Sequence, residues 1–123
     1  MPTTLWSTQV TLVGSGAGDM IDAGVLILFG QPVPEALAEF SVVHEGATPL
    51  ARPLQAGDTF HFAGTDYTVD QVGDRACENL VTLGHVVLYA NQPEEALLPG
   101  AIKVSGPGYL APQVGSVISF SGA

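Results

Sequence analysis

Positive charge is scarce in this sequence. Three Lys and Arg residues stand against twelve Asp and Glu residues, and the formal net charge is −9 at pH 7. A nucleic-acid-binding protein has to neutralise phosphates, and an anionic membrane surface also attracts basic segments. We therefore expect neither nucleic acid nor a membrane surface as a partner. An acidic surface instead favours solubility or a basic protein partner.

Cysteine and long apolar runs are also nearly absent. Cys77 is the only cysteine, which excludes an intramolecular disulfide and a cysteine-based zinc site. No basic segment followed by an apolar one stands near the N-terminus, so we expect no signal peptide. The longest apolar run, Val25–Phe29, is too short to cross a bilayer. We predict a cytoplasmic protein that is not embedded in a membrane and uses no cofactor or metal.

Turn-forming residues, in contrast, are plentiful. Fifteen Gly and nine Pro residues separate short apolar segments, and charged residues make up only 12% of the chain. This pattern is typical of a sheet-rich domain. We predict that residues 1–123 form a single all-β domain, a small closed or partly open barrel or sandwich with one or two short helices. The expected strands are Leu5–Val13, Val25–Phe29, Phe40–His44, Thr59–Phe62, Tyr67–Val72, His85–Ala90, Ala101–Val104 and Ser116–Phe120.

Two segments have helical signals. Pro34 suits the first turn of a short helix that runs through Ala38. A second helix is expected to begin at Asp74, to turn Cys77, Leu80 and Leu83 towards the core, and to end at Gly84. Residues 14–18, GSGAG, lack the Lys-Ser/Thr of a phosphate-binding loop, and we interpret them as a flexible turn.

The sequence contains one internal echo. Residues 55–64, QAGDTFHFAG, parallel residues 113–122, QVGSVISFSG, and both read as a tight turn followed by a strand. Such a match can reflect a structural repeat. It is also what any turn and strand of a β-barrel would produce, and the echo alone does not distinguish the two.

Three histidines are the candidates for chemistry. His61 stands between Phe60 and Phe62, so strand alternation directs it away from two core residues. His85 begins a strand after Gly84, where a structural role and a site role are equally compatible with its position. His44 ends a strand beside a flexible turn, a position that suits either a partly buried structural residue or a reactive one.

Several segments, taken together, resemble one known family. Residues 74–88 read DRACENLVTLGHVVL, residues 98–107 read LPGAIKVSGP, and residues 114–120 read VGSVISF. These are similar, in this order, to segments of the glucitol/sorbitol-specific IIA components of the sugar phosphotransferase system (PTS). Upstream, residues 39–44, EFSVVH, match the segment that carries that family's phosphorylated histidine. The resemblance covers nearly the whole chain.

The resemblance implies a phosphoryl relay. Phosphate would pass from the carrier HPr to His44, and then to a cysteine of the IIB component, so that the IIC channel delivers a sugar for phosphorylation. Some relatives carry a further histidine two residues after the nucleophile, where this chain has Gly46. The resemblance does not identify the sugar, since IIA components contact partner proteins and not the sugar itself. A homodimer is compatible with the composition, but no residue demands one.

Histidine suits this chemistry. Its ordinary pKa of about 6.5 leaves the ring largely neutral, and a ring nitrogen can then attack phosphorus to form a labile P–N bond. The other ring nitrogen needs a partner, for which Glu45, a backbone carbonyl and His85 are all candidates. We expect His85 to lie beside His44 and to help hold the phosphate.

Two other functions remain compatible with the residues. A metal-binding β-barrel would gather His44, His61, His85 and Glu45 around a divalent ion, although no His-x-His or His-x3–5-His spacing occurs. A regulatory or interaction module would retain the fold without phosphotransfer.

Overall fold

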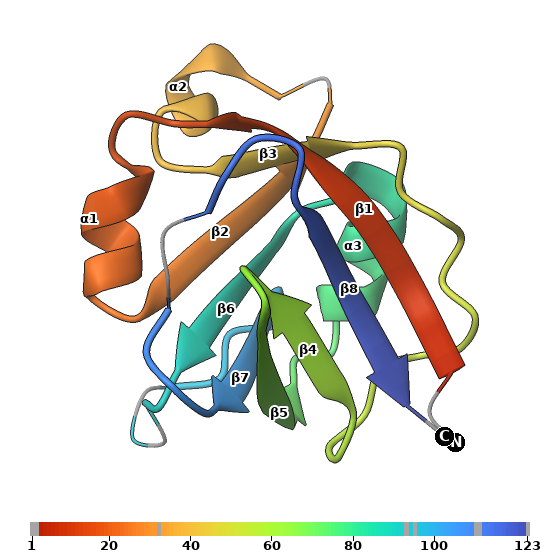
Figure 1. The fold of residues 1–123 in the computed structure, drawn as a ribbon. Coiled ribbons are helices and arrows are strands. Elements are labelled where there is room, and N and C mark those ends of the chain that lie inside the picture. The colour runs from red at the N-terminus through yellow and green to blue at the C-terminus, as the bar shows by residue number, and fades with distance from the viewer. Residues whose placement is uncertain (1–2, 32, 93, 95, 110–111, 123) are drawn as a thin grey trace.

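The computed structural model describes residues 3–31, 33–92, 94, 96–109 and 112–122. Eight strands close into a barrel in the order β1-β3-β2-β6-β7-β5-β4-β8 (Figure 1). Closure leaves no unpaired sheet edge among these strands. The strands are β1 Thr3–Val13, β2 Val25–Gly30, β3 Val42–Glu45, β4 Thr59–Phe62, β5 Thr65–Val72, β6 Val86–Ala90, β7 Ala101–Ser105 and β8 Val117–Gly122. The helices are α1 Ala17–Asp22, α2 Glu35–Ala38 and α3 Ala76–Leu83.

The predicted all-β barrel is confirmed, and all eight expected strands are present. The third strand is shorter than predicted, because β3 begins at Val42 and Phe40 lies in a turn with 45% of its surface exposed. His85 likewise precedes β6 instead of opening it. These differences lie at strand ends, where one residue of pairing decides the boundary.

The helices required more correction. α1 begins within residues 14–18, which we interpreted as a flexible turn, and continues to Asp22; Ala17 and Ile21, four residues apart, bury one face of it. α3 ends before Gly84 as predicted, but Arg75 and not Asp74 is its N-cap residue. Leu80 is buried, whereas Leu83 is 51% exposed. The described residues thus form three helices, where we expected one or two.

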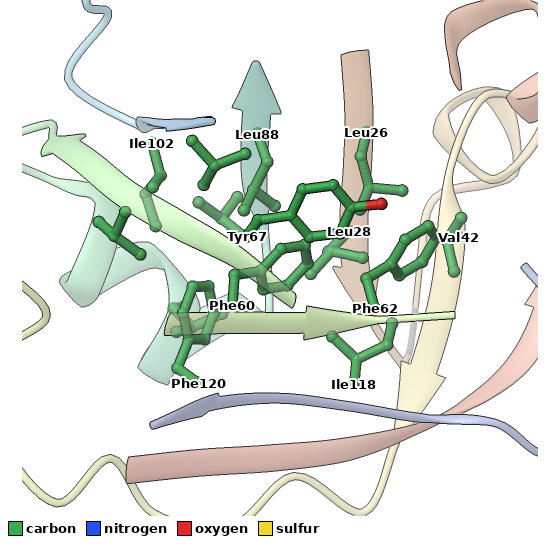
Figure 2. Packing of buried hydrophobic residues seen from close by; sticks show 14 of the residues in the cluster. Leu26, Leu28, Val42, Phe60, Phe62, Tyr67, Leu88, Ile102, Ile118 and Phe120 are labelled. Carbon is green, nitrogen blue, oxygen red and sulfur yellow. The ribbon is translucent and has the colours of Figure 1, made fainter. Parts of the chain in front are cut away.

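Aromatic and branched side chains fill the barrel. Phe60, Phe62 and Phe120 are almost fully buried, and the rings of Phe60 and Phe120 lie 4.9 Å apart. Figure 2 shows these rings and Tyr67 converging with aliphatic side chains from β2, β6, β7 and β8. Alternation along each strand directs these residues inward and leaves the other face outside. The core thus makes the barrel wall a rigid support for residues at the strand ends.

The barrel is built from two similar halves. β1 pairs with β3 antiparallel and β3 with β2 parallel; β5, β7 and β6 repeat both relationships. The antiparallel pair of each half carries an irregularity, between Val10 and Leu12 in one and between Val69 and Gln71 in the other. The two halves meet at the β2–β6 and β4–β8 pairs. The echoed segments form β4 and β8, equivalent strands in this arrangement.

Candidate functional site

His44 lies in β3, between β1 and β2. It pairs with Val10 of β1 and with Gly30 of β2, and only 1% of its surface is exposed. Its ring and that of Trp6 form a T-shaped pair, with the ring centroids 5.4 Å apart and the planes nearly perpendicular. Trp6 is itself part of the buried core. His44 is therefore a buried histidine held by the barrel wall.

Both ring nitrogens of His44 have hydrogen-bond partners. Nε2 lies 2.7 Å from the backbone oxygen of Gly84, and Nδ1 lies 2.8 Å from Oγ1 of Thr8. A carbonyl oxygen can only accept, so Nε2 carries the proton. In the neutral ring, Nδ1 then holds the lone pair and accepts the hydroxyl proton of Thr8. The partner of Nε2 is thus a backbone carbonyl, one of the three partners that the sequence suggested for a ring nitrogen of His44. Thr8, the partner of Nδ1, was not anticipated.

Thr8 has a second acceptor within reach. Its Oγ1 lies 3.2 Å from the backbone oxygen of Glu45, and the residue is 4% exposed. A hydroxyl can donate one proton and still accept another. Thr8 can therefore donate to Nδ1, or it can accept a proton from Nδ1 and donate to the carbonyl of Glu45. Strand pairing supports this contact, since Gln9 pairs with Glu45 and places β1 and β3 side by side.

Glycines allow the end of α3 to approach His44. Gly84 ends the helix with φ of +66°, a conformation that favours glycine. A Cβ on Gly84 would lie 2.8 Å from Cα of Gly30 and from Cε1 of His44. A Cβ on Gly30 would meet the backbone oxygen of Leu83 at 2.9 Å. Only glycine at both positions lets the carbonyl of Gly84 reach Nε2.

A hollow opens beside His44. It has a volume of about 320 Å³, and Val81 and Leu83 are exposed at its rim. The residues that line it are Phe29, Gly30, Gln31, His44, Gly46, Ala47 and 80–84 of α3 and its C-cap. None of these described lining residues is Lys or Arg. Thr8 is not among them, so the hollow lies on the Gly84 side of the ring.

Burial controls the protonation of His44. Removal from water lowers the pKa of its imidazole below the usual value, and the hydrogen bond to Gly84 opposes this shift only in part. His44 is therefore neutral at pH 7, with a lone pair on one nitrogen.

Among the described side chains, no hydrogen bond or ring contact joins His85 to His44. Its imidazole stacks on Phe29, with the ring centroids 4.6 Å apart, and its backbone N–H donates to the carbonyl of Asn79. Burial lowers the pKa of His85 as well. Gly84 links the two histidines, since it directly precedes His85 and its carbonyl accepts the hydrogen bond from Nε2 of His44. A role for His85 in holding phosphate remains a prediction.

His61 lies on another part of the barrel. Its Nδ1 pairs with Asp66 of β5, and its Nε2 lies 2.7 Å from Oγ of Ser121 in β8. This Ser–His–Asp arrangement resembles a nucleophile and its base, but Ser121 lies between β1 and β4, paired with Thr4 and Thr59. Both neighbouring strands occupy the backbone N–H groups that an oxyanion hole would require. We interpret the arrangement as a cross-strand link.

The histidines do not gather into a metal site. Within the described part of the chain, no group of three or more His, Cys, Asp or Glu side chains is arranged to hold a metal ion. A larger hollow of about 480 Å³ lies near Lys103, but no histidine or cysteine lines it among the described residues. Several of its polar side chains bind one another or the backbone: Ser105 donates to Asp70, and Asn91 donates to the carbonyl of Gly106.

The two halves of the barrel differ at the position of His44. Val10 pairs with His44 just before the irregularity in one half, and Val69 pairs with Val104 at the same place in the other. Val104 is 1% exposed, as is His44. An aliphatic residue therefore satisfies the packing at this position. Burying an imidazole there costs desolvation, which the contacts with Thr8 and Gly84 offset.

Known proteins resemble this chain over nearly its whole length. Residues 5–119 match the model of the PTS system glucitol/sorbitol-specific IIA component. Two proteins described as "PTS system glucitol/sorbitol-specific EIIA component", from Shigella flexneri and Escherichia coli K12, are each 35% identical over 120 residues, 96% of this chain and 95% of theirs. A crystal structure of a PTS system IIA component from Enterococcus faecalis V583 superimposes with a TM-score of 0.75, at 25% identity over 91% of this chain and 96% of that one.

No helix in the described residues combines the length and apolar character of a membrane span.

The resemblance of the sequence to the family is confirmed by relatives that match over nearly their whole length and by a solved structure with the same fold. A IIA component is a component of a sugar phosphotransferase. The chain belongs to the glucitol/sorbitol-specific IIA component family of the sugar phosphotransferase system.

Proposed function

We propose that this protein is a phosphoryl carrier that accepts phosphate from phospho-HPr on His44 and passes it to a IIB component for the uptake of glucitol (sorbitol) or a related polyol. One observation carries the proposal. A neutral histidine with both nitrogens oriented lies beside a hollow, at a position where the other half of the barrel has valine. Relatives described as glucitol/sorbitol-specific EIIA components support the partners and the sugar class.

The geometry suits a carrier that reacts only with a docked partner. Phosphoryl transfer depends on alignment and on stabilisation of charge more than on covalent assistance. His44 is rigidly aligned, but at 1% exposure it has no free face for an incoming phosphoryl group. Transfer therefore requires the Leu83–Gly84 corner, which closes one side of the hollow, to move aside when the donor docks.

The phosphoryl group must be held mainly by neutral groups. The described lining of the hollow includes no Lys or Arg, but it includes Gln31, Thr82 and several backbone segments rich in glycine. His85, next to Gly84 in the chain, would contribute if the opening of the corner turned its ring towards the hollow. Normal phosphoryl acceptance by His85→Asn would remove His85 from the proposal.

The negative charge of the protein should favour its encounter with HPr, the expected donor. The net charge of −9 attracts a partner with a basic docking face and accelerates its encounter at low salt. The rate of phosphoryl exchange with HPr should fall as ionic strength rises. An exchange rate that is insensitive to salt would remove steering from the proposal without affecting His44.

The decisive experiment is the intact mass of the protein after incubation with phosphoenolpyruvate, Enzyme I and HPr. The expected result is one acid-labile phosphoryl group on the wild type and on His61→Gln, and none on His44→Gln. His61→Gln is the matched control, because His61 is also hydrogen-bonded through both nitrogens but lies away from the hollow.

Phosphorylation of His44→Gln would move the nucleophile to another histidine. A wild type that gains no phosphate would overturn the carrier function and favour a regulatory module. Transfer onward is then tested by adding the IIB component and following loss of the phosphoryl group from His44.

A further inference from the structure

We infer that the outer face of β1 and β8 is the surface on which two copies of this protein associate in solution. We call it the β1–β8 face, and it consists of outward side chains of the two strands and of the turn before β8: Ser7, Gln9, Leu12, Val114, Val117 and Ser119. The inference does not rest on the proposed carrier function, because none of the described residues that line the hollow beside His44 belongs to β1 or β8.

The charged residues of the chain are confined to its middle. All twelve Asp and Glu residues lie between Asp19 and Glu95, and residues 1–18 and 104–123 contain no Asp, Glu, Lys, Arg or His. These two uncharged ends form β1 and β8, which pair antiparallel and lie side by side in Figure 1. Strand pairing thus gathers two uncharged segments into one uncharged face on a protein with a net charge of −9.

Apolar side chains project from this face. Val117 is 62% exposed, Val114 is 65% exposed and Leu12 is 46% exposed. Gln9 of β1 pairs with Val117 of β8, and the backbone N–H of Gly115 donates to the carbonyl of Val10, which holds the turn before β8 against β1. The exposed apolar side chains therefore come from adjacent segments, and covering them would remove apolar surface from water.

Charge selects a second copy as the occupant of this face. A basic partner gains most where it contacts carboxylates, and the β1–β8 face offers none. Two copies that each carry a net charge of −9 repel each other wherever their carboxylates meet, so they approach at least cost through an uncharged face. Carboxylates border the face, since Glu45 pairs with Gln9, and Glu35 and Glu39 line a hollow together with Leu12. This acidic rim opposes association at low salt, and screening should relieve it.

The polar side chains of the face are self-complementary. A two-fold interface brings the same patch of each copy together. Ser7, Gln9 and Ser119 each carry both a donor and an acceptor, so each can bind its own kind across a two-fold axis, which two carboxylates could not do. Because β1 and β8 each have a neighbour on both sides in the closed barrel, the two copies meet through side chains and not by adding a strand.

Sedimentation equilibrium of the wild type, Val117→Asp and Val81→Asp tests the face. Val81 is the matched control, because it is 61% exposed, like Val117, but lies on α3. The wild type should pass from one copy to two as its concentration rises from about 1 μM to about 1 mM. Val117→Asp places two carboxylates in one two-fold interface and should weaken association about 100-fold or more. Val81→Asp should associate like the wild type.

Salt dependence and NMR provide two independent readouts. Association of the wild type should strengthen as ionic strength rises, because screening weakens the repulsion between two acidic copies. The amide signals that differ between dilute and concentrated wild type should belong to β1, β8 and residues 112–116. Circular dichroism should show that Val117→Asp is folded, since the replaced side chain lies outside the core.

A wild type that remains a single copy at the highest concentration and at high salt would overturn this inference. A dimer that Val117→Asp leaves intact, or that Val81→Asp weakens equally, would overturn it as well. A single wild-type copy whose β1 and β8 signals shift when a IIB component is added would assign the face to that partner instead of a second copy. The carrier function is judged separately, by phosphorylation of His44.

Discussion

Arg52 contacts both carboxylate oxygens of Asp58. Nη2 of Arg52 lies 2.7 Å from Oδ1 and Nη1 lies 3.0 Å from Oδ2, while the backbone N–H of Gln55 also donates to Oδ2. The Asp58 side chain is only 4% exposed. Arg52 lies in the segment between β3 and β4, so this pair fastens that segment to the start of β4. One bidentate ion pair thus helps to hold the connection between β3 and β4 against the barrel.

Asp58→Asn should lower the stability of the protein clearly. It leaves the guanidinium without its bidentate carboxylate, and charged hydrogen bonds with little exposure are costly to lose. Glu78→Gln is the control, because the Arg75–Glu78 pair is more than 60% exposed on both sides and is expected to contribute at most about 0.5 kcal/mol. Denaturant unfolding at pH 7 compares the two; equal midpoints would contradict this role of Asp58.

Asp58 should also make the stability of the protein depend on pH in the acid range. Burial raises the pKa of Asp58, but hydrogen bonds from Arg52 and Gln55 and the charge of Arg52 outweigh this and lower its net pKa. Its contribution to stability is therefore present above the unfolded pKa and is lost as pH falls through the folded one. Between pH 5 and pH 2, the difference in unfolding free energy between wild type and Asp58→Asn should shrink.

Gly84→Ala should destabilise the protein and disturb His44. Alanine would need φ of +66°, and its Cβ would lie 2.8 Å from Gly30 and from Cε1 of His44. The strain and overlap together predict a loss of about 2–4 kcal/mol. Gly64→Ala is matched, since Gly64 has φ of +76° but nothing within 4 Å, and a loss of about 1–2 kcal/mol is expected.

Chemical denaturation measures both losses, and the NMR signals of His44 show whether its ring has moved. Unchanged His44 signals in Gly84→Ala, or equal losses in the two variants, would mean that the corner is looser than the structure indicates.

Strand positions could be predicted from the sequence because local patterns determine them. Alternating apolar residues between glycine-rich turns mark strands such as Thr59–Phe62 without reference to the rest of the chain. α1 was missed because Gly16 and Gly18 weaken its helical signal, and burial of Ala17 and Ile21 decides the conformation instead. Leu83 is exposed for a similar reason: tertiary packing, and not the local sequence pattern, decides which face of α3 is covered.

The site could be predicted only in part. His44 was a candidate by its place at a strand end and by resemblance to the family. A backbone carbonyl was among the candidate partners of its ring, but neither Gly84 nor Thr8 could be named, because they are 40 and 36 residues away and meet His44 only through barrel closure. Thr8 carries one signal in the sequence, because it is a polar residue on the same face of the strand as the apolar Trp6 and Val10.

The stability of the protein should depend on pH through His44. Burial lowers its pKa in the folded state below the unfolded value of about 6.5, so the unfolded chain binds more protons below that value. Unfolding free energy should therefore decrease as pH falls from 7 to 5, by at most about 1.4 kcal/mol per pH unit for one proton. His44→Gln should reduce this slope, and His85, whose pKa burial also lowers, should contribute to the slope that remains. Identical slopes in wild type and His44→Gln would show that His44 does not titrate in this range.

Trp6 should report the state of His44 directly. It is the only tryptophan, it is 1% exposed, and its ring lies 5.4 Å from that of His44, so a positive charge on the imidazole develops against the indole. The fluorescence of the folded protein should change with a midpoint below pH 6.5, because protonation of His44 is opposed by burial. The change should be absent in His44→Gln and retained in His61→Gln, whose ring lies elsewhere on the barrel. Phosphorylation of His44 should alter the same signal at constant pH, which makes Trp6 a probe for the rate of transfer. A fluorescence titration that persists in His44→Gln would assign the signal to another group and rule out this use of Trp6.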